Sequence, residues 1–372
     1  MKCKLSDICS FRKGKVEVEN LNAKNYISTE NMLPNKCGIT EASSLPTVSL
    51  TQEYKNGDVL VSNIRPYFKK IWQAEYDGGC SNDVLVFVPK PNTDKDFLYY
   101  VLADDDFFTY SMATSKGTKM PRGDKTSIMQ YEVPLIDLQV QKKIASVLKA
   151  LDERIKLNNE INNNLEQQAQ AIYQQMFIDN ARSNWAEGTL SDIADITMGQ
   201  SPSGSSYNED GTGTIFFQGR AEFGFRFPSV RLYTTEPKRM ARSNDTLMSV
   251  RAPVGDLNVA HTDCCIGRGL AAIHSKSNHQ SFVLYTMFSL KKQLDVFNGE
   301  GTVFGSINRN SLNDMPILIP SDDILDEFER IVAPMDLTIR NNYDENCRLQ
   351  DIRDTLLPRL MSGELDVSDI DI

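Results

Sequence analysis

The sequence holds several short segments in which basic side chains stand beside glycines or aromatic rings. Residues 65–70 (RPYFKK) combine cations with two rings, and residues 116–125 (KGTKMPRGDK) form a basic segment punctuated by two glycines. Lysine and arginine neutralise phosphate groups, and the arginine fork also matches the edge of guanine. These segments therefore indicate contacts to a nucleic acid, and the plainer alternative is a solvated basic face.

In the second half of the chain arginine is the dominant cation, at Arg220, Arg226, Arg231, Arg239, Arg242, Arg251, Arg268 and Arg309. Contacts to phosphate are more common than contacts to bases, and the sequence does not separate the two. The residues that we predict to contact DNA are Arg65, Lys69, Lys116, Lys119 and Arg122 in the first half, and Arg220, Arg251, Arg268 and Arg309 in the second.

One cluster resembles a set of metal ligands, namely His261, Asp263, Cys264, Cys265, His274 and His279. Adjacent cysteines are poorly placed to chelate one tetrahedral zinc ion, and the spacing of two to four residues between paired cysteines is missing. We therefore predict buried thiols and surface histidines here, and no metal site.

Catalytic motifs are absent from the sequence. It contains no phosphate-binding Gly-x-x-x-x-Gly-Lys-Ser/Thr loop, no Gly-x-Gly-x-x-Gly fingerprint, no His-Glu-x-x-His, no Gly-x-Ser-x-Gly and no Asn/Asp-Pro-Pro-aromatic segment. We therefore predict a chain that is not an enzyme, with no catalytic residues and no cofactor of its own.

Composition excludes several classes of protein. The 372 residues suggest two or three domains, and 40% hydrophobic with 24% charged residues is ordinary for a globular protein. No apolar run approaches the 18–20 residues of a membrane span, and the first residues lack the apolar stretch of a signal peptide. Seven scattered cysteines indicate reduced thiols and a cytoplasmic protein.

The negative charge is concentrated at one end of the chain. Residues 321–372 carry five basic and fourteen acidic side chains, whereas the rest of the chain is nearly balanced. The net charge of −10 therefore leaves room for basic faces elsewhere. The acidic region is interpreted either as a solvated helix face or as a surface that docks a partner subunit.

Four short segments recur in the same order about 182–187 residues later, which indicates one long unit used twice. The pairs are residues 5–8 (LSDI) with 190–193, 57–62 (GDVLVS) with 244–249 (NDTLMS), 115–118 (SKGT) with 299–302 (GEGT), and 133–136 (VPLI) with 315–318 (MPIL). Each copy then runs into a helical segment.

The two helical segments carry a heptad seam, the pattern of a coiled coil. The seam positions are Ile144, Leu148, Leu151, Ile155, Asn158, Asn162, Leu165, Ala169, Ile172 and Met176, and, 184 residues later, Phe328, Val332, Met335, Ile339, Asn342, Asn346, Leu349, Arg353, Leu356 and Leu360. Asparagine recurs at the same two positions, and a seam asparagine fixes register at a cost in stability. We predict that Asn158, Asn162, Asn342 and Asn346 pair the helices; ordinary amphipathic helices on a core are the alternative.

The remaining elements complete an α+β prediction. Residues 83–89 and 314–320 suggest buried strands, and residues 97–102 and 282–288 suggest helices at matching places in the two copies. Pro334 predicts a kink or a late start of the second long helix, and Pro358 and Gly363 predict its end. We expect two mixed α/β domains, two long helices forming an antiparallel coiled coil, and an internal pseudo-two-fold repeat.

Over nearly its whole length the sequence resembles the specificity subunits of type I restriction–modification systems. The helical segments 141–158 (beginning QKKIA) and 165–173 (LEQQAQAIY) and the ending 356–365 (LLPRLMSGEL) carry most of the resemblance. Asp58, Ser62 and Arg65-Pro66, residues 247–255 (LMSVRAPVG) and residues 266–270 (IGRGL) are similar to recurrent segments of the family's target recognition domains.

The resemblance implies target recognition domains at residues 1–138 and 181–320, a central helix at 139–180, and a distal helix with an acidic tail at 321–372. Each domain would read one half of a split DNA target, and the helices would space the domains and dock two methyltransferase (M) subunits. S-adenosylmethionine would bind in the M subunits, restriction (R) subunits would join the complex, and no membrane is involved. Because the central helix precedes only the second domain, the distal helix is expected to pack near the N-terminus. The alternative is a coiled-coil scaffold that no longer reads DNA, as a silent or truncated member would be.

Overall fold

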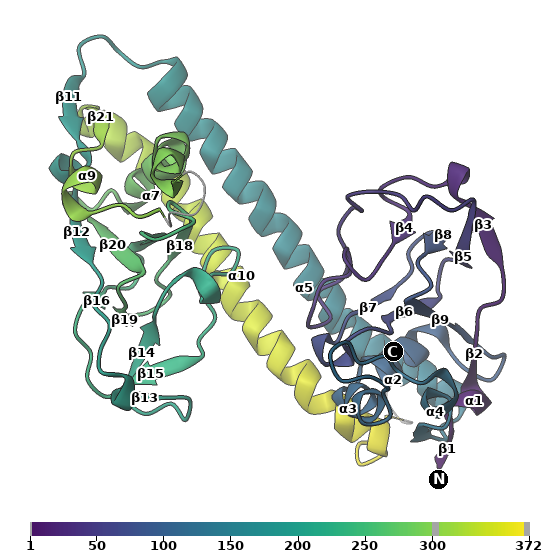
Figure 1. The fold of residues 1–372 in the computed structure, drawn as a ribbon. Coiled ribbons are helices and arrows are strands. Elements are labelled where there is room, and N and C mark those ends of the chain that lie inside the picture. Colours follow the sequence, from purple (N-terminus) through teal and green to yellow (C-terminus); the bar gives the residue numbers. More distant parts are fainter. Residues whose placement is uncertain (1, 300–304, 368–372) are drawn as a thin grey trace. The chain divides into compact units, whose positions relative to one another are not determined.

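The computed structural model describes residues 2–299 and 305–367. Contacts divide the chain into two compact units, the first made of Met1–Lys156 with Asn346–Ile372 and the second of Leu157–Glu345. Two long helices, α5 (Leu138–Tyr173) and α10 (Asp322–Ser362), each contribute residues to both units (Figure 1). Among the described residues, no helix combines the length and the apolarity needed to cross a membrane.

The first unit contains two four-stranded sheets and a two-stranded pair. One sheet is wholly antiparallel, in the order β2 (Cys9–Phe11), β9 (Val84–Pro89), β6 (Val59–Ser62) and β7 (Ile71–Gln73). The other has the order β3 (Lys15–Glu17), β5 (Leu50–Tyr54), β8 (Gly78–Cys80) and β4 (Tyr26–Ile27), with β4 parallel to β8. The two-stranded pair is β1 (Lys2–Lys4) with β10 (Glu132–Pro134).

The second unit repeats this arrangement. Its antiparallel sheet has the order β12 (Ala194–Met198), β20 (Leu270–Ser275), β17 (Thr246–Ser249) and β18 (Leu257–Val259). Its mixed sheet has the order β13 (Tyr207–Asn208), β15 (Leu232–Thr234), β14 (Thr214–Phe217), β19 (Cys264–Ile266) and β16 (Met240–Ala241), with β14 parallel to β19. The two-stranded pair is β11 (Ala186–Thr189) with β21 (Pro316–Ile319).

The repeated LSDI segments form equivalent short helices, α1 (Leu5–Ile8) and α6 (Leu190–Ile193). The Leu5 amide donates to the Tyr131 carbonyl at 2.8 Å, and the Leu190 amide donates to the Met315 carbonyl at 2.9 Å. The duplication predicted from the sequence is therefore present in the fold. Of the pair 115–118 with 299–302, residues 300–302 lie outside the described residues.

The remaining α-helices follow the same repeat. They are α2 (Lys95–Ala103), α3 (Asp105–Ala113) and α4 (Lys125–Ile128) in the first unit, and α7 (Gln280–Ser289), α8 (Lys291–Leu294) and α9 (Arg309–Asn313) in the second. Asp94 caps α2 by accepting from the amides of Asp96 and Phe97, both at 3.0 Å. The 3₁₀ turns are η1 (Val18–Asn20), η2 (Pro66–Phe68), η4 (Gly204–Ser206), η5 (Arg220–Glu222) and η6 (Asp295–Asn298), and η3 (Gln174–Asp179) is a π-helical segment.

Each unit buries one face of its antiparallel sheet against parts of both long helices. In the first unit Leu148 of α5 and Leu360 of α10 belong to the same buried cluster as Leu5 and Phe97. In the second, Phe328 of α10 packs against Tyr173 with ring centroids 5.9 Å apart. The distal helix therefore packs near the N-terminus, as expected.

The predicted seam positions of the helices are all buried or half-buried. Within the second unit the Asn342 amide donates to the Asn162 carbonyl at 2.8 Å, so these two asparagines meet. The Asn158 amide donates to Glu345 at 2.7 Å, and Asn346 is buried. A buried amide is satisfied in few alignments of two helices, so these residues restrict register.

Two expectations about individual elements are wrong. Helix α10 begins at Asp322 and continues through Pro334 and Pro358 to Ser362, so a late start at Pro334 and an end at Pro358 are both wrong. Although each proline removes one hydrogen bond, the buried residues Val332 and Leu357 pack the helix into the cores of its units. Gly363, with φ at +75°, follows its end as predicted. Strand β21 is not buried: its residues alternate between exposed and half-buried, because it pairs only with β11 and turns one face to solvent.

Candidate nucleic-acid interface

Main-chain hydrogen bonds bring the two basic segments of the first unit together. The Arg65 amide donates to the Pro121 carbonyl at 2.8 Å, and the Gly123 amide donates to the Asn63 carbonyl at 3.1 Å. The five predicted contacts of this unit therefore lie on two joined loops beside the ends of β6 and β9. We call them the first basic edge: Arg65, Lys69, Lys116, Lys119 and Arg122.

The loop that carries Lys119 is closed by Lys116 and Arg122, which exchange both main-chain hydrogen bonds at 2.9 Å. Gly117 inside it has φ at +93°, a conformation that disfavours other residues. Arg65 and Lys69, on either side of η2, also have positive φ values of 51° and 50°. A non-glycine residue with a positive φ value lowers the stability of the fold by about 1–3 kcal/mol, and such residues cluster at ligand-binding sites.

Three cations of the first basic edge already have acidic partners. Lys69 lies 2.7 Å from Asp105, Arg122 lies 3.2 Å from Asp83, and Lys116 contacts Asp124. The hydrogen bond from Lys116 lowers the pKa of Asp124 to about 2. Lys119 is exposed, and among the described residues it has no ion-pair partner.

This difference predicts unequal effects of two lysine substitutions. Lys119→Ala is expected to weaken binding of double-stranded DNA by about threefold to tenfold and to lower the slope of log K against log salt by about 0.9. Lys69→Ala should have a smaller effect, because binding by Lys69 first requires breaking its pair with Asp105. Titration of labelled DNA at several salt concentrations measures both, and an equal loss for the two variants would contradict the assignment.

The second unit gathers its arginines at the equivalent place. The Val250 amide donates to the Gly269 carbonyl at 2.9 Å, and the Ala252 amide donates to the Gly305 carbonyl at 3.0 Å. The Gly269 amide in turn donates to the Gln218 carbonyl at 3.3 Å, next to η5. These bonds join the loops of the second basic edge: Arg220, Arg251, Arg268 and Arg309.

The two edges share one main-chain pairing at equivalent positions. An isolated bridge joins Ile64 to Arg122 in the first unit, and another joins Arg251 to Ser306 in the second. Both lie where the repeated segments 57–62 and 244–249 end. The repeat therefore places both predicted groups of cations at the same end of their sheets.

The second basic edge is less neutralised than the first. Arg220 is paired with Asp256, which also contacts Lys291 at 3.2 Å. Arg251, Arg268 and Arg309 are exposed, and none of them has an ion-pair partner in the parts of the chain that the structure describes. These three guanidinium groups are free to meet phosphates or base edges.

Arg226, one of the second-half arginines, lies inside the second unit. Its side chain is 5% exposed and lies 2.9 Å from Glu166 of α5 and 3.1 Å from Asp336 of α10. It also donates to the Tyr285 hydroxyl at 3.2 Å. The sequence did not predict that Arg226 is buried, because the residues next to it in the chain give no sign of burial.

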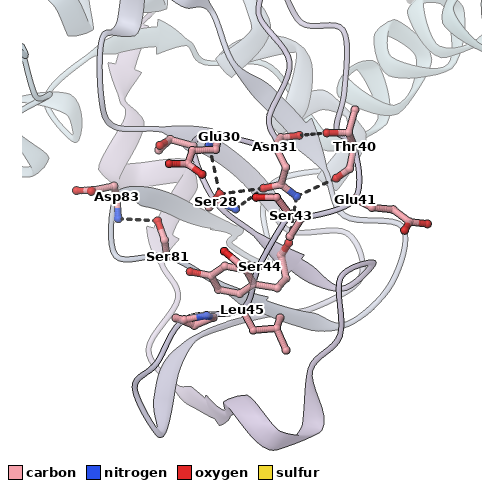
Figure 2. Close-up of a pocket in the computed structure, with 14 residues that line it drawn as sticks. Ser28, Glu30, Asn31, Thr40, Glu41, Ser43, Ser44, Leu45, Ser81 and Asp83 are labelled. Atoms are coloured by element: carbon pink, nitrogen blue, oxygen red, sulfur yellow. Dashed lines mark hydrogen bonds between the residues drawn. The ribbon is translucent and has the colours of Figure 1, made fainter. Parts of the chain in front are cut away.

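A polar hollow of about 420 Å³ lies in the first unit (Figure 2). Asn31 lines it, with its amide donating to the Thr40 carbonyl at 2.8 Å and its oxygen accepting from the Ser28 amide at 2.6 Å. Asp83, the partner of Arg122, also lines it. Its hydroxyl and carboxylate groups could accept or donate hydrogen bonds, and no motif in the sequence points to it.

The histidines, cysteines and aspartate that resemble metal ligands in the sequence are not gathered into one group in the structure. His261, His274 and His279 each face a different aspartate, Asp344, Asp245 and Asp326 respectively. Cys264 and Cys265 are buried in β19, and burial raises the pKa of Cys264 to about 12. Within residues 2–299 and 305–367, no three histidine, cysteine or acidic side chains are grouped to hold a metal ion.

Comparison with known proteins gives a consistent result. A family model described as "Type I restriction modification DNA specificity domain" matches residues 1–167 and again residues 182–342. The chain is 28% identical to the putative type I restriction enzyme MjaX specificity subunit of Methanocaldococcus jannaschii, over 84% of this chain and 79% of the relative. It is 23% identical to the type I restriction enzyme HindI specificity subunit of Haemophilus influenzae, over 91% and 94%.

The fold is also similar to a solved structure. The crystal structure of the type I restriction–modification system S subunit from M. genitalium matches with a TM-score of 0.64. The match covers 97% of this chain and 96% of that chain at 17% identity. The likeness therefore concerns the arrangement of the elements.

Proposed function

Because the chain belongs to the family of type I restriction–modification DNA specificity subunits, we propose that each of its units reads one half of a split DNA target. DNA recognition is the role of this family. The observation that carries the proposal is the presence of a basic edge at the same place in both copies of the repeat. Two different sets of side chains on one repeated framework suit two half-sites of different sequence.

The side chains of the edges support binding to a duplex. Exposed cations neutralise phosphates and fix the orientation of a protein on DNA. Arginine can also donate two hydrogen bonds to the O6 and N7 acceptors of guanine, and acidic and amide groups can accept from the amino groups of cytosine and adenine. We assign the first basic edge and the polar hollow to one half-site, and the second basic edge to the other.

We further propose that the two long helices form an antiparallel coiled coil that spaces the recognition units. In the second unit, Asn158, Asn162 and Tyr173 of α5 contact Glu345, Asn342 and Phe328 of α10. In the first unit, Asp152 of α5 lies 2.9 Å from Arg353 of α10. Within the second unit the residue number in α5 rises as that of its partner in α10 falls, which is the order of antiparallel helices. The 41 residues of α10 span about 60 Å, longer than one turn of DNA at about 34–36 Å.

The outer faces of these helices suit docking of partner subunits. Leu157 and Ile161 on α5 are 52% and 43% exposed, and Leu337 and Ile352 on α10 are 56% and 47% exposed. Exposed apolar side chains of this kind mark protein interaction sites. We propose that two M subunits dock here, that they supply S-adenosylmethionine and the methylation of adenine, and that R subunits join through the complex.

In this proposal the chain is not catalytic. Its sequence carries no catalytic motif, and family members act within type I complexes. A cytoplasmic location follows from the DNA target. The alternative, a scaffold that no longer reads DNA, is not favoured by the family match.

Co-expression with an M subunit tests the proposal. Sequencing of methyladenine in the host DNA should give one split, asymmetric motif that is methylated only when this chain is present. Exchange of residues 1–138 for the same segment of another family member should change one half of the motif and leave the other half intact. A complex that forms without any motif would favour the scaffold alternative.

A further inference from the structure

In each unit a buried tyrosine donates a hydrogen bond to an aspartate on a long helix. The Tyr100 hydroxyl of α2 lies 2.8 Å from Asp152 Oδ2 on α5. The Tyr285 hydroxyl of α7 lies 2.9 Å from Asp336 Oδ1 on α10. The tyrosines are 185 residues apart in the sequence and the aspartates 184, so the two contacts are copies made by the same repeat.

Each aspartate also meets an arginine that ties it to the other long helix. Asp152 on α5 accepts from Arg353 of α10 at 2.9 Å. In the second unit the link has two parts, because Arg226 lies between Asp336 on α10 and Glu166 on α5 at 3.1 and 2.9 Å. Each site thus joins three partners, namely the globular part of its unit and both long helices.

These hydrogen bonds form at only one position of the helices, which distinguishes them from the apolar packing around them. Apolar side chains can settle into neighbouring grooves of a helix at modest cost. Asp152 and Asp336 are half-buried, at 29% and 21% exposed, and a carboxylate that loses directed hydrogen bonds at such a site loses stability. The observed alignment is therefore favoured over its neighbours. The same reasoning explains how one buried asparagine fixes the register of a coiled coil.

We propose that the two tyrosine–aspartate–arginine contacts act as latches that fix how each recognition unit is seated on the helices. In doing so they set the separation of half-sites that the protein accepts. This inference rests on the proposed function, since it concerns the spacing between the two halves of the target. Tyr100, Tyr285, Arg226 and Arg353 are then positioning residues that contact no DNA.

The test uses the complex of the full chain with its M subunit. Tyr100→Phe, Tyr285→Phe and the double variant remove only hydroxyl groups and leave the ring packing intact. Methylation rates are measured on DNA with the native spacer and with spacers one base pair shorter and longer. The ratio of the methylation rate on the native spacer to the rate on an altered spacer should fall by about tenfold in the double variant. Each variant loses a hydrogen bond to a charged group, so the recognition unit is held less firmly in one position on the helices.

Tyr54→Phe is the matched control, since the hydroxyl of the buried Tyr54 donates to the Asn25 carbonyl at 3.0 Å, which is not part of a long helix. It should leave the ratio unchanged. If the double variant does not assemble with the M subunit, the single variants carry the comparison. An unchanged ratio in the Tyr100→Phe and Tyr285→Phe variants, or an equal fall in Tyr54→Phe, would overturn the proposal of latches but not the proposed function. A wild-type complex that accepts all spacers equally would overturn the proposed function and the inference with it.

Discussion

Replacement of Arg226 by methionine is expected to lower the free energy of unfolding by about 3–5 kcal/mol. Arg226 is 5% exposed, and its guanidinium lies within 3.1 Å of both Glu166 and Asp336. Methionine fills much of the same space but leaves the two mostly buried carboxylates close together without a counter-charge. Desolvation and mutual repulsion of these carboxylates account for the size of the loss.

Denaturant unfolding of the purified chain measures this effect. Arg359→Met is the control, because Arg359 pairs with Glu364 at the surface and such pairs contribute about 1 kcal/mol or less. Addition of Glu166→Gln to Arg226→Met should restore part of the lost stability, since it removes one of the stranded charges. If Arg226→Met were no more harmful than Arg359→Met, the buried pairing would have no energetic importance.

The loss should also depend on pH. Burial raises the pKa of Glu166 above its usual value, and the nearby Arg226 partly opposes this shift. A carboxyl group with a raised pKa in the folded state binds its proton more tightly there than in the unfolded chain. Ionisation therefore costs stability as pH rises through the folded pKa. Without Arg226 this cost grows, so the difference between variant and wild type should be smaller at pH 5 than at pH 7.

The largest expected effect on function comes from alanine replacement of Arg251, Arg268 and Arg309 together. We expect the affinity of the assembled complex for its target to fall by about 100-fold or more, since one arginine contact to a base contributes about 1–3 kcal/mol. None of the three has an ion-pair partner among the described residues, so no described acidic side chain of the second unit competes with DNA for them. The fold should persist, because all three are exposed.

The salt dependence of binding separates the two kinds of contact. Each lost phosphate contact should reduce the slope of log K against log salt by about 0.9, whereas a lost base contact should relax one position of the methylated motif. Alanine at Arg182 and Lys292, two exposed cations of the same unit outside the second basic edge, is the control. Equal losses in the control and in the triple variant would show that only the total charge matters.

Patterns that repeat along the chain were sufficient to predict two copies of a mixed α/β domain and two long helices, whereas the pairing of these helices as a coiled coil stays a proposal. The copied segment LSDI forms the same short helix in both units, and the heptad positions of α5 and α10 are buried or half-buried. Helix periodicity, capping and turn preferences are local properties, so a single sequence carries them. The duplication also placed the DNA-contact candidates in comparable parts of the two copies. That their loops are joined by main-chain hydrogen bonds was seen only in the structure, and their roles in binding stay a prediction.

The tertiary structure alone decided how the charged residues are used. Arg226 and Arg251 look alike in the sequence, yet one is buried between the long helices and the other is exposed. Lys69 and Lys119 were predicted alike, and only Lys69 has an acidic partner, 36 positions further along the chain. Long side chains find partners wherever the fold brings charges within a few ångströms, and this depends on contacts between distant segments. For that reason the sequence determined which charged residues were available, and the packing within each unit determined which of them hold the fold and which stay exposed as candidates for DNA contact.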